Sequence, residues 1–140
     1  MGDVSNSAGF EELNHVADRA VHVWAPSLEA LFEQAARAMF SLMADISTIR
    51  PERRHEITIE AEDLETALVD WLNALLFWRE TQGEMYSDFR VRWEDGLLRG
   101  EFAGQPGYPT FAVVKAATFH NLRVEQDEQG LWHATIVFDT

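Results

Sequence analysis

The order of two hydrophobic periodicities along the chain constrains its fold most. From Leu28 to Ala44, and again from Leu64 to Trp78, apolar residues recur at the spacing of an amphipathic helix. The second half of the chain instead shows strand-like alternation broken by turns. Two helices followed by a run of strands predict an α+β fold. We expect both helices to pack on an antiparallel or mixed β-sheet, with a C-terminal β-meander.

Local signals place the elements more closely. Ser27 and Asp63 are suitable N-cap residues for the two helices. Two short strands are expected before the first helix and one between the helices, at Gly9–Leu13, Val21–Trp24 and His55–Ala61. The later strands are expected at Phe89–Trp93, Leu97–Phe102, Phe111–Val124 and Leu131–Phe138, with a loop at Gly104–Pro109 and a turn at Asp127–Gly130.

The second helix is apolar nearly all round, which is unusual for a surface helix. Val69, Leu76 and Phe77 lie off its main apolar stripe. The helix is therefore either buried on two sides or exposes a patch. Asp70, Asn73 and Phe77 share the side away from that stripe. They either pack beneath another element or form a candidate partner surface.

Length and composition limit the class of protein. The chain has 140 residues, of which 46% are hydrophobic. We expect a disordered or loosely ordered tail at residues 1–8 and a single domain at 9–140. With no cysteine, disulfides, thiolate zinc sites and cysteine nucleophiles are excluded. The sequence shows neither a signal peptide nor a membrane-spanning run, so we expect a cytoplasmic protein without a membrane partner.

The net charge limits the choice of partner. Eleven Lys and Arg residues stand against 24 Asp and Glu residues, which gives a formal net charge of −13. Direct nucleic acid binding is not expected, because it depends mostly on neutralising phosphates. So acidic a chain would be attracted to a basic protein. Alternatively, the acidity serves solubility alone.

Three charged residues occur where the hydrophobic pattern does not call for them. Asp18 lies in a polar break after the first apolar segment, Lys115 interrupts an apolar run, and Asp139 directly follows the last predicted strand. Chain ends often lie close together, and two carboxylates that meet would suit a hard cation. The carboxylate of Thr140 would add a donor if the natural chain ends there. His15 is a candidate ligand or neighbour of a ligand.

Each of these residues also has a plain structural interpretation. Asp18 is a common turn former. Lys115 could block pairing at a sheet edge instead of facing a carboxylate. Asp139 is an acid after a strand, and such a residue is usually just solvated. His22, His55 and His133 show no metal-ligand spacing, so we interpret them as structural. The sequence contains no phosphate-binding loop and no nucleophile elbow. An enzyme is therefore not expected.

Four segments together resemble the archease family. The segment from His15 to Ala20 is similar to a His-Thr-Ala-Asp-Val-Gly-like motif, although Arg19 and Ala20 replace its last two residues. Residues 63–76 resemble the family's second helix, residues 114–120 its lysine-bearing strand, and residues 137–140 its Phe-Asp ending. The segments occur in the family's order between about residue 10 and residue 140. The loop at 104–109 is shorter than is usual for the family.

The resemblance implies a function that composition does not indicate. Archeases are accessory proteins of GTP-dependent RtcB-type RNA ligases, which act in tRNA splicing and RNA repair. They promote guanylylation of the ligase and multiple turnover. Carried over to this chain, Asp18, Asp139 and an oxygen of Thr140 would hold a divalent metal ion (calcium, magnesium or manganese). Lys115 and His15 would be functional neighbours of that site.

Two other functions remain open. One is a small metal-dependent hydrolase that uses Asp18 and Asp139. The other is a chaperone-like protein-binding module that uses the apolar patch on the second helix.

Overall fold

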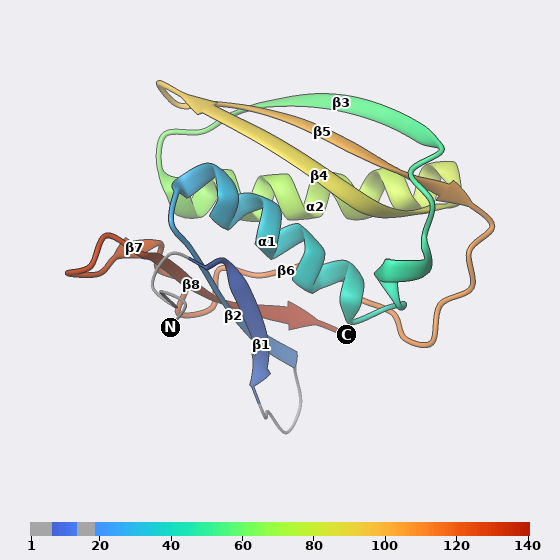
Figure 1. Cartoon of the computed structure of the whole chain (residues 1–140), viewed down its shortest axis with the longest axis horizontal. Coiled ribbons are helices and arrows are strands. Elements are labelled where there is room, and N and C mark those ends of the chain that lie inside the picture. The colour runs from blue at the N-terminus through green and yellow to red at the C-terminus, as the bar shows by residue number, and fades with distance from the viewer. Residues whose placement is uncertain (1–6, 14–18) are drawn as a thin grey trace.

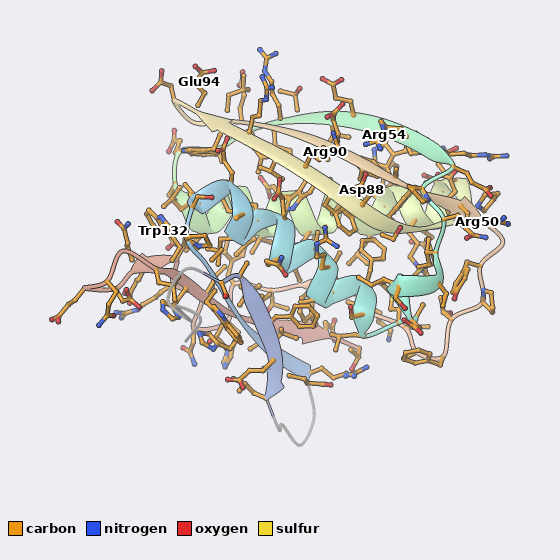
Figure 2. The ribbon with its side chains drawn as sticks, in the orientation of Figure 1. Arg50, Arg54, Asp88, Arg90, Glu94 and Trp132 are labelled. Atoms are coloured by element: carbon orange, nitrogen blue, oxygen red, sulfur yellow. The ribbon has the colours of Figure 1, made fainter. Side chains whose placement is uncertain are left out.

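The computed structural model describes residues 7–13 and 19–140. Helices α1 (Leu28–Ser41) and α2 (Leu64–Gln82) lie between two antiparallel β-sheets. Figure 1 shows a three-stranded sheet above the helices and the sheet containing β1, β2 and β8 below them, and Figure 2 shows the same view with side chains. The predicted α+β class is confirmed. The single predicted sheet is wrong, because the strands divide between two sheets.

The two sheets take strands from both halves of the chain. The five-stranded sheet has the order β1-β2-β8-β6, and β7 also pairs with β8. Its strands are β1 (Gly9–Leu13), β2 (Arg19–Ala25), β6 (Ala116–Ala117), β7 (Glu125–Gln126) and β8 (Trp132–Asp139). The other sheet has the order β3-β5-β4, with β3 (Arg53–Glu60), β4 (Glu84–Glu94) and β5 (Leu97–Pro106). A 3-10 helix, η2 (Ile46–Thr48), follows α1.

Helix α1 begins where the sequence predicts. The Ser27 hydroxyl oxygen accepts a hydrogen bond from the Ala30 N–H at 3.1 Å, which satisfies one free donor of the first turn. Leu31, Phe32 and Met39 are fully buried on its apolar face. The helix contacts both β2 and β4, so it joins the two sheets into one core.

Helix α2 is apolar on most sides because two sides are covered. Helix α2 contacts the sheet β3-β5-β4, and it also contacts β6 and α1. Trp71 is fully buried, and its indole Nε1–H donates to the Phe32 carbonyl at 3.0 Å. A Cβ on Gly100 of β5 would lie 2.2 Å from the Trp71 ring, so glycine permits this close packing. Burial on two sides is thus confirmed, although Phe77 remains 65% exposed.

The predicted strand at Phe111–Val124 is wrong. Only Ala116 and Ala117 form a strand there. The segment bonds to the end of β8, with the Thr118 N–H donating to the Val137 carbonyl at 3.0 Å. It then turns at Asn121, whose φ is 51°. The segment is thus an irregular connection, and its apolar residues do not alternate across a sheet.

The loop predicted at Gly104–Pro109 starts too early. Strand β5 continues to Pro106 and pairs with β4, which itself begins at Glu84. The two strands approach closely at Gly104, where a Cβ would lie 1.8 Å from the Met85 carbonyl oxygen. The glycine that indicated a loop in the sequence instead permits strand pairing.

In the described residues, no helix is both long and apolar enough to cross a bilayer.

Candidate functional site

Three strand ends meet at one end of the five-stranded sheet. Asp139 is the last residue of β8 and pairs with Ala116, the first residue of β6. The Lys115 N–H donates to the Asp139 carbonyl at 2.8 Å. On the other side of β8, Arg19 at the start of β2 pairs with Phe138. The fold therefore brings Lys115 and Asp139 together from positions 24 residues apart.

The side chains at this end of the sheet are open to solvent. Phe138 is fully buried in the core, whereas Asp139, Thr140 and Lys115 are exposed. Within the described part of the chain, Lys115 makes no ion pair. An exposed lysine beside the edge strand β6 agrees with the edge-blocking interpretation, and it leaves the ammonium available to a ligand or partner.

The predicted metal site includes residues from both ends of the chain. Asp18 and His15 lie outside the described residues, so their predicted positions stay predictions. Asp139 and Thr140 offer carboxylate and main-chain oxygens, the donors that hard cations such as Ca²⁺ and Mg²⁺ prefer. Within residues 7–13 and 19–140, no three His, Asp or Glu side chains form a metal-binding group. The described residues alone therefore give this site no group of three such side chains.

The positive charge of Arg19 is paired with a carboxylate of the neighbouring strand β1. Its guanidinium binds Glu12 with both carboxylate oxygens, at 2.6 and 2.8 Å, and donates to the Leu42 carbonyl at 3.1 Å. The Arg19 hydrogen bond and charge lower the pKa of Glu12 below its ordinary value. At this position, where the chain departs from the family motif, the charge of Arg19 is therefore paired with the charge of Glu12.

Asn73 connects helix α2 to the segment that carries Lys115. Its side-chain Nδ2–H donates to the Ala117 carbonyl at 3.1 Å, and its Oδ1 accepts from the Ala117 N–H at 2.8 Å. Of the predicted patch, Asn73 is thus packed against β6, while Asp70 and Phe77 are exposed. In the sequence, the signal for this anchoring role is a single amide within an apolar helical run. The sequence analysis left open whether Asn73 packs beneath another element or belongs to a partner surface.

Apolar side chains are exposed on α2 and on the segment between β5 and β7. Phe77 is 65% exposed, and Phe111, Val113 and Phe119 are 72%, 56% and 55% exposed. The last three flank Lys115 in the chain. Their exposure was not predicted, because the sequence analysis placed residues 111–124 in one long strand.

A second polar cluster lies away from this site, in the three-stranded sheet. Glu84 is buried, and its carboxylate accepts hydrogen bonds from His55 at 2.7 Å and from the Tyr86 hydroxyl at 2.9 Å. Burial would raise the pKa of Glu84, but the bonds from His55 and Tyr86 outweigh it and lower the pKa. Burial and the Glu84 carboxylate raise the pKa of Tyr86. We interpret this cluster as structural.

The comparisons with known proteins decide the family. A model of the archease protein family matches residues 10–140. The chain belongs to the archease family. It is 40% identical to protein archease of Methanopyrus kandleri, a match that covers 93% of this chain and 98% of the relative. It is 36% identical to protein archease of Methanothermobacter thermautotrophicus, covering 94% and 98%.

Solved structures agree with this assignment. The chain is similar to the solution structure of protein 1598 of Methanobacterium thermoautotrophicum, with a TM-score of 0.76 and 32% identity over 94% of this chain and 99% of that one. It also shares the fold of a Thermotoga maritima protein described as an archease and possible chaperone. That match has a TM-score of 0.67 and 24% identity over 93% and 96% of the two chains.

Proposed function

We propose that this protein is a cytoplasmic, non-enzymatic accessory protein that activates a GTP-dependent RtcB-type RNA ligase. In this proposal it promotes guanylylation of the ligase and multiple turnover in tRNA splicing or RNA repair. The main supporting observation is the meeting of Lys115 and Asp139 at the exposed end of β8. These two residues lie in two of the segments that resemble the family.

The proposed acidic site combines both ends of the domain. The β2–β8 pairing ends at Arg19 and Phe138, which are the chain neighbours of Asp18 and Asp139. We propose that Asp18, Asp139 and an oxygen of Thr140 hold a divalent ion such as calcium, magnesium or manganese. Bound there, the ion would offer positive charge to an anionic group of the ligase–nucleotide complex.

Lys115 has a separate role in this proposal. Its main chain is fixed by the bond to Asp139, while its ammonium faces solvent. A lysine so placed can bind a phosphate or a carboxylate of the partner as a point charge. It would work beside the metal ion without being one of its ligands.

The charge of the chain supports a protein partner over direct binding to RNA. With a formal net charge of −13, the protein would be repelled by phosphates but attracted to the basic surface that an RNA ligase needs. Phe77 and Asp70, both exposed on α2, are candidate contact residues for that partner.

A chaperone-like binding module is the second candidate. The observation that favours it is the exposure of Phe77, Phe111, Val113 and Phe119. Exposed aromatic side chains are typical of surfaces that bind other proteins. The two functions differ in their requirement for the acidic site, since a general apolar binder would not need Asp139.

The test is a time course of ligase guanylylation with GTP and a divalent metal, with and without this protein. We expect the protein to raise the rate and the number of turnovers. Lys115→Ala should reduce this effect, and Lys115→Arg should restore it only in part, because the two cations differ in shape and hydration. An unchanged rate with the wild-type protein would contradict the proposed function. Full suppression of ligase aggregation without any rate increase would favour the chaperone-like module.

A further inference from the structure

Three arginines gather on the outer face of the three-stranded sheet, which is the face away from the helices. Buried and exposed residues alternate along the middle of β4 and β5, and the exposed residues include Arg90, Arg92 and Arg99. Strand pairing places Arg92 directly opposite Arg99, and Arg90 is two residues from Arg92 on the same strand. Side chains two residues apart share one face of a strand, so all three project from the same small area. Figure 2 shows Arg90 on this sheet, in the layer above the helices.

The opposition of Arg92 and Arg99 places two like charges side by side. Within residues 7–13 and 19–140, Arg90, Arg92 and Arg99 make no ion pair. Arg54 and Asp88 on the same face do pair, at 3.0 Å, so this sheet satisfies an arginine where an acid is within reach. Like charges directly opposite each other on neighbouring strands destabilise a sheet. An anion bound between Arg92 and Arg99 would relieve this repulsion.

A surface hollow of about 370 Å³ lies among these arginines. Its lining residues are Glu56, Arg90, Val91, Arg92, Arg99 and Glu101. Three guanidinium groups against two carboxylates give the hollow a positive local charge, within a chain whose formal net charge is −13. Glu101 is opposite both Arg90 and Glu56, which leaves Arg92 and Arg99 as the most positive part of the hollow.

We propose that this hollow binds one phosphate group, held between the guanidinium groups of Arg92 and Arg99. A guanidinium presents its N–H donors in a planar fork that matches two oxygens of a phosphate. Arg90 adds positive charge beside the pair. Because the net charge of the chain repels phosphates in general, binding would be confined to this hollow.

The acidic residues around the arginine pair limit the size of the ligand. Glu60 and Glu94 flank the pair toward the β4–β5 hairpin, since both are opposite Leu97. Glu56 and Glu101 flank it on the other side. A strand of RNA laid along this face would bring further phosphates against these carboxylates. The hollow therefore fits inorganic phosphate or a small phosphate monoester, and not a polyanion.

The test is a titration of the isotope-labelled full-length protein with sodium phosphate, followed by NMR chemical shifts at neutral pH and constant ionic strength. We expect saturable shifts for the main-chain amides of Arg92 and Arg99 and for their side-chain Nε–H groups. Arg92→Gln and Arg99→Gln should each weaken phosphate binding by at least about 10-fold, the effect of losing one hydrogen bond between charged groups. Glycerol phosphate, tested in parallel, distinguishes the two sources. Binding tighter than that of phosphate indicates a monoester ligand, and equal or weaker binding indicates inorganic phosphate.

Thermal unfolding gives a second readout. Without phosphate, Arg92→Gln should unfold at the same temperature as the wild type or higher, because it removes one of two opposed charges. Added phosphate should raise the unfolding midpoint of the wild type more than that of Arg92→Gln. Arg123→Gln is the matched control, because it removes an exposed arginine outside this sheet, and it should keep the full response. Glu101→Gln removes a carboxylate from the hollow and should strengthen phosphate binding, whereas Glu128→Gln, exposed elsewhere, should not.

Three results would overturn the inference. Shifts that do not saturate, or that sodium acetate reproduces equally, would indicate a general effect of anions. Unchanged phosphate affinity in folded Arg92→Gln and Arg99→Gln variants would place any bound phosphate elsewhere. A single-stranded RNA oligonucleotide that binds through the same arginines and more tightly than phosphate would replace the small ligand with nucleic acid. None of these measurements needs the ligase, so they are independent of the proposed function.

Discussion

Replacing Asn73 with alanine should destabilise the protein and loosen the segment that carries Lys115. The amide of Asn73 makes two hydrogen bonds to the main chain of Ala117, at 2.8 and 3.1 Å. Ala117 is only 4% exposed, so water replaces these bonds poorly. At about 0.5–1.5 kcal/mol for each bond, the free energy of unfolding should fall by about 1–3 kcal/mol.

The assay is urea unfolding followed by far-UV circular dichroism. Asp70→Ala is the matched control, because it removes a polar side chain one turn earlier on the same helix, where it is exposed. It should change the free energy of unfolding by less than about 0.5 kcal/mol. Amide hydrogen exchange at Ala117 should be faster in Asn73→Ala than in Asp70→Ala. Equal stability and equal exchange in the two variants would refute the anchoring role of Asn73.

Three further predictions concern the core and the exposed surface. Glu84→Gln should cost about 1–3 kcal/mol in urea unfolding. The pKa of Glu84 is lower in the folded protein than in the unfolded chain, where it is about 4.3. The Glu84 carboxylate therefore stabilises the fold above about pH 4.3, and this stabilisation is lost as the pH falls through the folded-state pKa. In an acid titration, Glu84→Gln should thus lose less stability than the wild type. Gly100→Ala should lower the thermal unfolding midpoint by forcing a methyl group against Trp71, at a cost of about 1–3 kcal/mol; an unchanged midpoint would contradict this packing. Phe77→Ala should leave the free energy of unfolding within about 0.5 kcal/mol, because the side chain is mostly exposed, but should reduce ligase stimulation; full stimulation would remove Phe77 from the partner surface.

Local patterns were sufficient to predict the helices. Both N-caps are where the sequence places them, with the Asp63 carboxylate accepting from the Thr66 N–H at 2.7 Å. The alternation in the last strand correctly separates buried Ile136 and Phe138 from exposed Asp139. These features depend on neighbours within a few residues, which a sequence displays directly.

Pairing over long distances could not be predicted in the same way. The run from Phe111 to Val124 is mostly apolar and was predicted as a strand, yet its partners are Asn73 of α2 and the end of β8. Whether the strands form one sheet or two depends on which strands pair with each other. The hydrophobic periodicity of a strand does not specify its pairing partner. The approach of His22 to His133 is a further example, because 111 residues separate them. No sequence spacing could indicate that their rings form a hydrogen bond.

The most direct test of the central claim is the guanylylation rate of the cognate ligase with Asp139→Asn. The variant keeps the size of the side chain but removes a charged oxygen donor from the end of β8, and the exposed position leaves the core unchanged. Asp18→Asn should behave in the same way, and Asp70→Asn is the control for the loss of one surface charge. We predict that both site variants lose stimulation while remaining folded, and that Asp70→Asn retains it. Full stimulation by folded Asp139→Asn would contradict the proposal that an acidic site at this end of the sheet activates the ligase.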